Sequence, residues 1–409
     1  MTYLEKLLDG EVVEWKALGD VCDFQNGFAF KSSLFKESGL PIIRITNVDG
    51  VNVDLSDVKY FSPDDYKSGN PTNFSIKKGD VLIAMSGATT GKIGYYNLDT
   101  VAYLNQRVGK FQPKEGILNN RFLYHFLLTQ TEYLYVLAGG GAQPNLSSNT
   151  IKEKLQIPIP PLEIQQKIVA ILDAFTELTA ELTAELTARK KQYAYYREQL
   201  FCFDENVISY LPLGDDRIGK FIRGGGLQKK DFTEAGVGCI HYGQIYTFYG
   251  TYTNKTKSYV SIEFAKKARK AKHGDLVIAT TSENDEDVCK AVAWMGENEI
   301  AVSSDACFYS HNLNPKFVAY FFQTEQFQKQ KRPFITGAKV RRVNADDLAK
   351  IKIPVPSKQK QDRIVAILDK FNTLTTSISE GLPKEIELRK KQYEYYRDML
   401  LSFPKKETA

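Results

Sequence analysis

Two short segments approach motifs that bind nucleotides or transfer methyl groups, and both depart from them at the residues that carry the chemistry. Residues 86–93 (SGATTGKI) have the spacing of a phosphate-binding loop. Serine stands in place of the first glycine, however, and isoleucine in place of the hydroxyl side chain that binds magnesium. Residues 70–74 (NPTNF) only approximate the Asn-Pro-Pro-Tyr motif of amino-methyltransferases. We therefore expect a glycine turn at 86–93 and no catalytic residue in this chain.

The side chains that most often bind metals are scattered along the chain. The histidines and cysteines show neither ligand spacing nor a CxxC pair, at His125, His241, His273, His311, Cys22, Cys202, Cys239, Cys289 and Cys307. We expect no metal site, and reduced thiols in a cytoplasmic protein rather than disulfides. No apolar run reaches the ~18 residues of a membrane span, and no signal sequence opens the chain. A membrane partner is therefore not expected.

Cationic and amide side chains that suit DNA binding form several groups, and the net charge of +5 permits such binding. Cations bind phosphates, whereas arginine, asparagine and glutamine read base edges. The candidates in the first half are Gln25, Asn26, Lys31, Arg44, Asn47, Lys92, Arg107 and Gln143. The candidates in the second half are Arg223, Lys229, Lys267, Lys270, Lys331, Arg332, Lys339, Arg341 and Arg342. Any one basic run could be a solvated face, but several runs in one domain favour phosphate binding.

Asn145 and Ser147 have two interpretations. Both could contact DNA, but they precede an apolar residue, Ile151, at the point where a helix could start. Their side chains can accept hydrogen bonds from the first free amides of a helix. We favour helix capping for both residues.

An internal repeat indicates which elements position these residues. Residues 157–173 (IPIPPLEIQQKIVAILD) correspond to 353–369 (IPVPSKQKQDRIVAILD), and RKKQYxYYR follows each copy, at 189–197 and 389–397. A period near 200 residues indicates tandem domains rather than a solenoid. Between the shared segments the two halves diverge. One scaffold that reads two different targets would show this pattern.

The repeated segments predict two long helices. Apolar residues follow the alternating three-and-four spacing of a coiled-coil seam, at Ile168, Ile171, Phe175, Leu178 and Leu182 and at Ile364, Ile367, Phe371, Leu374 and Ile378. A helix of about 40 residues spans ~60 Å and cannot bury such a stripe alone. We therefore expect the two helices to pack against each other. Gly381 and Pro383 predict a kink in the second helix, because an interior proline removes a backbone hydrogen bond.

Each long helix follows a variable domain that mixes strands and helices. Residues 41–45 and 80–84 have the pattern of strands, and 120–128 that of a helix, so we expect an α+β fold. The predicted division is a first variable domain at 1–156, a first spacer helix at 157–203, a second variable domain at 204–352, a second spacer helix at 353–403 and a tail at 404–409. The whole should have internal pseudo-two-fold symmetry. Because 14–20 resembles 210–215, the N-terminus is expected to pack near the C-terminal helix.

Tyrosine and arginine gather at the end of each predicted helix. The residues concerned are Tyr193, Tyr196, Arg197, Tyr393, Tyr396 and Arg397. They could stack on bases. We favour packing in the helix pair or at a protein interface, where tyrosine and arginine are enriched.

Over essentially its whole length, the chain resembles the specificity subunits of type I restriction-modification systems. The paired Ile-Pro-x-Pro, Ile-Val-Ala-Ile-Leu-Asp and Arg-Lys-Lys-Gln-Tyr-x-Tyr-Tyr-Arg segments carry this resemblance. It implies that each variable domain is a target-recognition domain for one half of a split, asymmetric site in double-stranded DNA. It also implies that the two helices form an antiparallel coiled coil, which spaces the domains and docks two methyltransferase subunits.

The resemblance places the chemistry in the partner subunits. The assembled complex would methylate adenine N6 with S-adenosylmethionine, and restriction or translocase subunits would use ATP and Mg²⁺. The chain itself would bind no cofactor and catalyse no reaction. The alternative is a coiled-coil adaptor or scaffold that binds proteins only.

The first predicted helix contains three copies of Glu-Leu-Thr-Ala, at 177–180, 181–184 and 185–188. Good helix formers alone could explain such a repeat. However, 14 positions separate Phe175 from Arg189, whereas 18 separate Phe371 from Arg389, a difference of one four-residue unit. The length of the helix between the shared segments is therefore expected to act as a ruler that sets a spacing.

Adding or deleting one Glu-Leu-Thr-Ala unit is expected to change the unspecified spacer of the DNA site by about one or two base pairs. One unit lengthens a helix by ~6 Å, and one base pair occupies ~3.4 Å. Methylome sequencing of cells that carry each variant with its partner subunits measures the spacer. Unchanged spacing in both variants would contradict the ruler.

Overall fold

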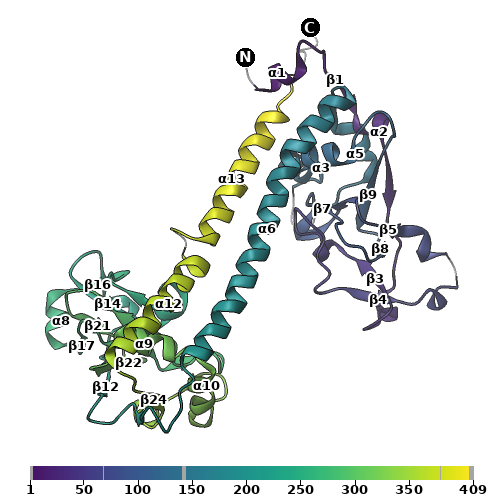
Figure 1. Cartoon of the computed structure of the whole chain (residues 1–409). Coiled ribbons are helices and arrows are strands. Elements are labelled where there is room, and N and C mark those ends of the chain that lie inside the picture. Colours follow the sequence, from purple (N-terminus) through teal and green to yellow (C-terminus); the bar gives the residue numbers. More distant parts are fainter. Residues whose placement is uncertain (1–2, 68, 141–143, 378, 405–409) are drawn as a thin grey trace. The chain divides into compact units, whose positions relative to one another are not determined.

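The computed structural model describes residues 3–67, 69–140, 144–377 and 379–404 (Figure 1). Two predicted residues, Gln143 and Ile378, lie outside this part of the chain. The chain divides into two compact units, one made of residues 1–181 and 386–409 and the other of residues 182–385. Each unit contains one α+β domain, so the predicted fold class is confirmed.

Two sheets form the first domain, in the strand orders β2-β9-β6-β7 and β4-β3-β8-β5. The first sheet is antiparallel throughout, whereas β3 and β8 are parallel in the second. The elements are α1 (Tyr3–Leu8), β1 (Glu14–Ala17), α2 (Leu18–Val21), β2 (Cys22–Asn26), β3 (Leu40–Ile43), β4 (Lys59–Phe61), β5 (Ser75–Ile76), β6 (Val81–Ala84), β7 (Ile93–Tyr95), β8 (Ala102–Leu104), β9 (Val108–Pro113), α3 (Asn120–Thr129), α4 (Thr131–Leu137), α5 (Ser148–Lys154) and β10 (Gln156–Ile159).

The second domain repeats this arrangement, with sheets in the orders β12-β22-β18-β20-β15 and β13-β16-β14-β21-β17. Its elements are β11 (Tyr210–Pro212), β12 (Gly219–Arg223), β13 (Phe232–Thr233), β14 (Val237–Ile240), α7 (Tyr242–Thr247), β15 (Tyr252–Thr253), β16 (Ser258–Val260), α8 (Ile262–Lys267), β17 (Lys270–Ala271), β18 (Leu276–Ala279), β19 (Thr281–Ser282), β20 (Ala291–Trp294), β21 (Ile300–Val302), β22 (Ala306–His311), α9 (Pro315–Phe321), α10 (Glu325–Lys331), β23 (Arg341–Arg342), α11 (Ala345–Leu348) and β24 (Lys352–Pro354).

The central strands explain why the sequence signal was strongest there. Every residue of β6 and of β18 is buried, because each strand lies inside its sheet with side chains packed on both faces. The predicted strands at 41–45 and 80–84 and the predicted helix at 120–128 are confirmed as β3, β6 and α3.

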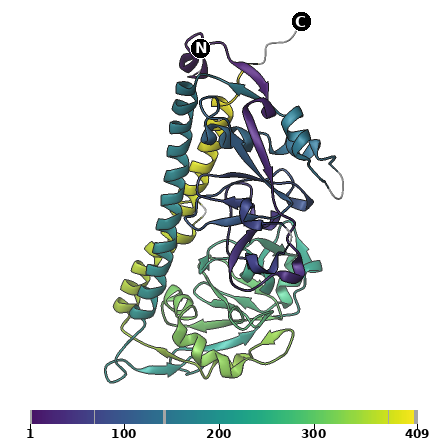
Figure 2. The same ribbon diagram turned by 90° about the vertical axis from the view of Figure 1, so that its right-hand side faces the viewer.

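The first long helix, α6 (Leu162–Leu200), is 39 residues long and uninterrupted, as predicted (Figure 2). In the first unit, Phe175 of α6 stacks on Tyr396 of α13 (Leu382–Leu400), with ring centroids 5.1 Å apart. In the second unit, Tyr196 of α6 stacks on Phe371 of α12 (Lys358–Thr376) at 5.6 Å. Later residues of α6 thus meet earlier residues of the C-terminal helices. The predicted antiparallel pairing is confirmed.

The predicted seam serves two neighbours rather than one. Ile168 and Ile364 are fully buried, but each belongs to the core of its own domain. Leu178, Leu182 and Leu374, farther along the seam, are only half-buried. The apolar stripe therefore covers the domain near the start of each helix and the partner helix beyond it.

The second spacer is two helices, so the prediction of a single kinked helix is wrong. α12 ends at Thr376 and α13 begins at Leu382 (Figure 1). Gly381 has φ +80°, and a Cβ there would lie 2.5 Å from the carbonyl oxygen of Thr373. Pro383 stands in the first turn of α13, where its missing N–H costs no helical hydrogen bond. Glycine and proline together end one helix and start the next.

An aspartate clasp attaches the first domain to α6. The Asp173 carboxylate accepts hydrogen bonds from Arg121 and His125 of α3, with His125 Nε2 2.8 Å from Asp173 Oδ1. The Tyr393 hydroxyl of α13 lies 2.9 Å from His125 Nδ1. Burial alone would raise the pKa of Asp173, but the hydrogen bonds from His125 and Arg121 lower it to about 2.

The second domain uses an equivalent clasp on α12. Asp369 accepts from Lys316 Nζ and from the Tyr320 hydroxyl of α9, each at 2.7 Å. Upstream, Asn119 and Asn314 cap α3 and α9 in the same way, each accepting from two backbone amides. The two halves therefore share the contacts that fix a domain to its helix.

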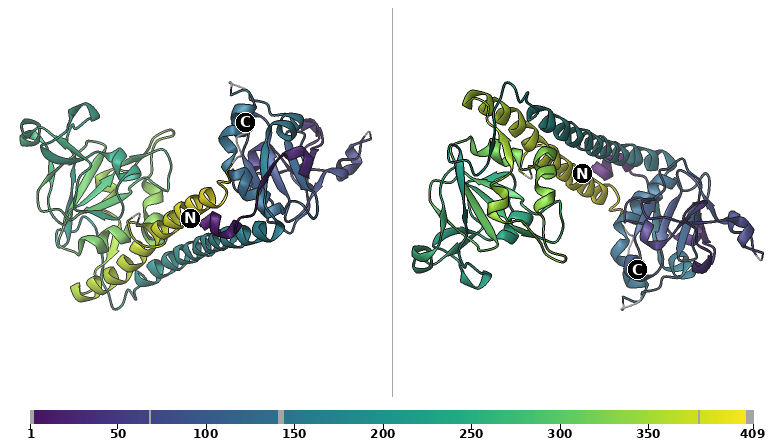
Figure 3. Two further views of the ribbon diagram at one scale, coloured as in Figure 1. Left: turned by 90° about the horizontal axis from the view of Figure 1, so that it is seen from above. Right: turned by 90° about the horizontal axis from the view of Figure 1, so that it is seen from below.

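The N-terminus packs near the C-terminal helix in the first unit, as expected. β1 pairs antiparallel with β10, and Leu4 and Leu8 of α1 share a core with Leu400 of α13. The Trp15 indole donates to the carbonyl oxygen of Pro404 at 3.2 Å. Figure 3 shows α1 against the ends of α6 and α13. In the second unit, β11 pairs with β24 in the place of β1 and β10. In the described part of the chain, no helix is both long and apolar enough to cross a membrane.

Lys331, predicted to bind phosphate, lies in the interior of the second domain. Its side chain is fully buried, and Nζ donates to the carbonyl oxygens of Asp285, Glu286 and Val288 at 2.8–3.0 Å. Burial lowers the pKa of this ammonium. All three N–H bonds are used to hold the 285–288 loop, so the predicted phosphate contact is wrong. Basic residues spaced along a helix alternate between faces, and the sequence did not show which face was buried.

Lys331→Ala is expected to destabilise the second unit by about 3 kcal/mol or more, because three buried carbonyl groups lose their donor. Urea unfolding followed by fluorescence measures the change. Lys329→Ala, at an exposed position of the same helix, is the matched control and should shift the free energy of unfolding by less than ~0.5 kcal/mol. Equal effects of the two substitutions would contradict the structural role.

Candidate nucleic-acid interface

A polar cleft opens at one end of the β12–β22 pair in the second domain. It has a volume of about 560 Å³. Arg223 ends β12, Asp305 precedes β22, and Arg342 lies on β23. Other polar side chains in the lining are Thr280, Thr281, Ser304, Asn344, Asp346 and Asp347. Cationic donors and carboxylate acceptors therefore meet in one concave surface, which suits the mixed donors and acceptors of base edges.

Backbone hydrogen bonds hold the walls of this cleft. The Thr280 amide donates to the carbonyl of Asp305 at 3.0 Å, and the Val343 amide donates to the carbonyl of Thr280 at 3.1 Å. Thr281 pairs with Arg342 across the β19–β23 ladder. Main-chain hydrogen bonds thus form the frame of the cleft, and the Thr280 hydroxyl adds a hydrogen bond to the Asp305 carbonyl at 3.0 Å.

The first domain has the same frame. The Met85 amide donates to the carbonyl of Arg107 at 2.9 Å, and the Leu146 amide donates to the carbonyl of Met85 at 2.8 Å. Ser86 forms an antiparallel bridge with Asn145, in the place of Thr281 with Arg342. These contacts make Arg107 the equivalent of Asp305 and Asn145 the equivalent of Arg342.

The side chains on this frame of the first domain also interact. Arg107 Nη1 donates to Asn145 Oδ1 at 3.2 Å, and Asn26 Nδ2 donates to Ser148 Oγ at 3.4 Å. Asn26 and Arg107 were predicted as DNA-binding residues, and the structure brings them to the same region. Ser147 caps α5 as favoured, accepting from the Thr150 amide at 3.0 Å. Asn145 caps no helix, so its interpretation as a cap is wrong.

The segment at 86–93, which resembles a phosphate-binding loop in sequence, is part of this frame through the bridge between Ser86 and Asn145. Residues Gly87–Thr89 form a short 3₁₀ turn, and Gly91 has φ +85°. The predicted glycine turn is confirmed.

The prediction that Asn47 of the first domain binds DNA is wrong. Its side chain is 3% exposed, and Nδ2 donates to the carbonyls of Asp54 and Asp57 at 3.0 Å each. A side chain that is used in this way holds a loop and is not free to read a base. Arg44 also contacts Asp57, through its carbonyl at 3.2 Å and its carboxylate at 3.6 Å. Gln25 donates to the carbonyl of Asn73.

Lys31 is exposed and Lys92 is half-buried. They stay predictions for DNA contact.

In the second domain, several predicted cations already have acidic partners. Lys270 pairs with Glu299 at 2.8 Å, Arg332 with Glu325 at 3.2 Å and Arg341 with Asp285 at 2.8 Å. The remaining predicted cations are exposed, at Arg223, Lys229, Lys267, Lys339 and Arg342. Arg341 and Arg342 are adjacent in β23, and successive side chains of a strand point to opposite faces. Arg341 therefore pairs with Asp285, whereas Arg342 lines the cleft.

The tyrosines at the two helix ends differ in what their side chains contact. Tyr193 and Tyr393 point inward, donating to Gln323 at 3.3 Å and to His125 at 2.9 Å. Tyr196 and Tyr396 belong to the helix pair through Phe371 and Phe175. Cation–π contacts place Arg197 and Arg397 over the rings of Tyr193 and Tyr393.

Tyr195 and Tyr395, at equivalent positions of the repeated YxYYR segment, face solvent. Tyr195 is 60% exposed and Tyr395 is 66% exposed.

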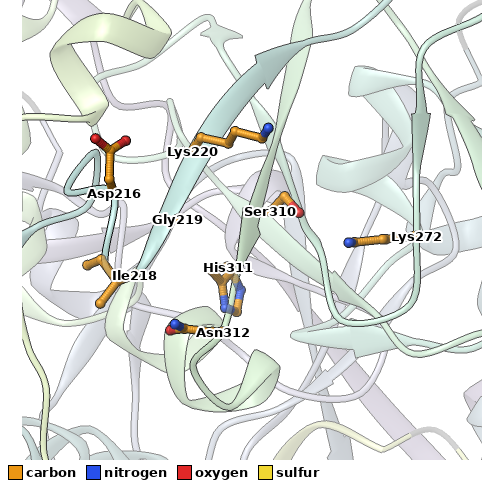
Figure 4. A pocket seen from close by; sticks show the side chains of 8 residues that line it. All are labelled: Asp216, Ile218, Gly219, Lys220, Lys272, Ser310, His311 and Asn312. Atoms are coloured by element: carbon orange, nitrogen blue, oxygen red, sulfur yellow. The ribbon is translucent and has the colours of Figure 1, made fainter.

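A second pocket lies at the opposite end of β12 and β22. Lys220, Lys272, Ser310 and His311 line it (Figure 4). The Tyr309 and His311 ring centroids lie 4.8 Å apart, with the two ring planes tilted by 31°. Burial lowers the pKa of His311 to about 4. In the described residues, no group of three or more His, Cys, Asp or Glu side chains is placed to hold a metal ion.

Because the pKa of His311 falls from 6.5 to about 4 on folding, the unfolded chain binds the proton more tightly. The stability contributed by neutral His311 is complete above pH 6.5 and is lost as the pH falls towards 4. His311→Leu is expected to remove up to about 2 kcal/mol of the loss of stability between pH 7.5 and pH 5. Urea unfolding of the unaltered chain and the variant at both pH values tests this. Equal pH dependence of the two proteins would contradict it.

Comparison with known proteins places this architecture in one family. The family model for the type I restriction modification DNA specificity domain matches residues 11–189 and 218–388. A provisionally assigned type I restriction enzyme specificity subunit of Haemophilus influenzae is 36% identical, over 98% of each chain. The EcoR124I/EcoR124II specificity subunit of Escherichia coli is 32% identical, over 100% of this chain and 99% of its own.

Solved structures show the same fold. The S subunit of a type I restriction-modification system from M. genitalium matches with a TM-score of 0.54 and 17% identity, over 99% of this chain and 100% of its own. A chain from a study of complex assembly in the type I system matches with a TM-score of 0.60 and 16% identity, over 96% and 98%. The chain belongs to the family of type I restriction-modification specificity subunits, the non-catalytic, DNA-specifying part of these systems.

Proposed function

We propose that each domain reads one half of an asymmetric, bipartite site in double-stranded DNA. The observation that supports this most directly is that the backbone frame of the second-domain cleft recurs in the first domain. Arg107 and Asn145 stand on this frame in the first domain, where Asp305 and Arg342 stand in the second. Equal frames with unequal hydrogen-bonding groups suit two readers of different sequences, because base identity is read through donor and acceptor patterns.

Exposed lysines outside the clefts would supply the contacts to phosphates. Lys229, Lys267 and Lys339 in the second domain and Lys31 in the first have no ion pair among the described residues. Phosphate contacts position a protein on a duplex without reading its sequence. Arg223, at the rim of the second cleft, could serve either purpose.

The long helices would set the distance between the two half-sites. The Glu-Leu-Thr-Ala repeat occupies residues 177–188 of α6. It lies after the Asp173 clasp of the first domain and before Tyr193, which is anchored to Gln323 in the second. A change in repeat number would leave both anchors intact and alter the length of helix between them.

The repeated helix ends would dock two methyltransferase subunits. Tyr195 and Tyr395 are exposed at equivalent positions, and a repeated surface suits two copies of one partner. The assembled complex would use S-adenosylmethionine to methylate adenine N6 in the cytoplasm. With restriction subunits it would use ATP and Mg²⁺ to cleave unmodified DNA.

Replacement of residues 1–155 by the variable domain of another specificity subunit is expected to change one half of the methylated site. The other half should stay the same, because its reader, clasp and helix are unaltered. Methylome sequencing of cells that carry the chimera and its partner subunits gives both halves. Replacement of residues 204–351 is the reciprocal control and should change the opposite half.

A change in both halves after either replacement would contradict independent reading by the two domains. If the unaltered chain assembles with methyltransferase but the complex binds DNA without sequence preference, the result would instead support the interpretation of the chain as a protein-binding adaptor.

A further inference from the structure

We propose that two side-chain positions on the shared backbone frame of each domain determine base specificity. They are Arg107 and Asn145 in the first domain and Asp305 and Arg342 in the second. This inference rests on the proposed function, since it assigns the residues through which each domain would read its half-site. It predicts that these positions can be exchanged between the domains.

The equivalence of the positions follows from hydrogen bonds of the main chain. The carbonyl oxygens of Arg107 and Asp305 accept from Met85 and Thr280, the residues that follow β6 and β18. Asn145 and Arg342 lie opposite Ser86 and Thr281 on short antiparallel bridges. Each pair of positions therefore occupies the same two places on the same frame.

The side chains at these positions are available for a ligand. Arg107, Asn145 and Arg342 are exposed, and Asp305 is half-exposed. Arg107 and Asn145 contact each other, which leaves the Asn145 amide N–H₂ and the other Arg107 donors free. The Asp305 carboxylate and the Arg342 guanidinium have no ion pair within the described part of the chain.

The neighbouring arginine shows why Arg342 is the better reader. Arg341, the preceding residue of β23, pairs with Asp285 at 2.8 Å and donates to the carbonyl of Gly337 at 2.6 Å. It holds the 285–288 loop together with Lys331. Arg341 is thus a positioning residue, whereas the side chain of Arg342 enters the cleft.

The chemistry of the two pairs differs in a way that would select different bases. The first pair presents mainly donors, which match the acceptor edge of guanine, or adenine through a bidentate asparagine. The second pair combines an acceptor with a donor. Aspartate accepts from the amino group of cytosine, and arginine donates to guanine, so this pair matches both members of a G·C pair.

The test exchanges the pairs. Asp305→Arg with Arg342→Asn gives the second domain the side chains of the first, and Arg107→Asp with Asn145→Arg is the reciprocal variant. Each is assembled with its methyltransferase subunit and assayed on DNA libraries in which one half-site is randomised. We expect the altered domain to lose its original base preference by roughly 10-fold or more. The half-site read by the other domain should be unchanged.

Matched variants separate reading from folding. Arg217→Asn removes an exposed arginine at the opposite end of β12 and should leave both half-sites unchanged. Arg342→Lys keeps the charge but loses the two-pronged donor geometry of arginine. It should relax the preference of the second half-site only, and it decides the question if the double variant fails to fold.

Three results are distinguishable. If the unaltered complex methylates no bipartite site, the proposed function fails. If it does, but Arg342→Lys and both exchanges leave the two half-sites unchanged, only this inference is overturned. A change in both half-sites from one exchanged pair would also overturn it.

Discussion

One half-buried acidic group on a helix fixes each domain in place. Asp173 receives Arg121 and His125 from α3, and Asp369 receives Lys316 and Tyr320 from α9. Partly buried ion pairs of this kind are costly to leave half-made, since an unpaired charge would remain out of water. Each helix therefore holds its domain in one orientation. A helix can set the distance between two domains only if each domain is held in a fixed orientation on it.

Inside each domain, too, the groups that hold the structure differ from the groups available for recognition. Main-chain hydrogen bonds from Met85 and Thr280 build the same frame in both domains, so the frame depends little on the side chains of Arg107, Asn145, Asp305 and Arg342. Side chains on such a frame can change without loss of the fold, because surface substitutions away from packed features cost little stability. Lys331 and Arg341 hold the 285–288 loop of the second domain. In the proposed function, this arrangement lets recognition diverge while assembly stays constant.

Sequence reasoning succeeded where a pattern repeats or has a period. The duplicated segments predicted paired helices, and the apolar run at 80–84 predicted the buried central strand β6. It failed where the outcome depends on which face of an element is covered. Lys331 and Asn47 look like DNA-binding residues in sequence, but both are buried and hold backbone carbonyls. Asn145 looked like a helix cap, yet its neighbour Ser147 takes that role.

The sequence alone determined the duplicated plan and the two paired helices, because these follow from local periodicity and from identity between distant segments. The antiparallel order and the family came from the resemblance of those segments to known specificity subunits. Only the tertiary structure decided which polar residues come together. Arg107 meets Asn145, and Asp305 joins Arg342, because Met85 and Thr280 each hydrogen-bond through the main chain to both of the segments that carry them. Such contacts have no signature in either segment by itself. They arise when strands far apart in the chain are brought to the same end of a sheet.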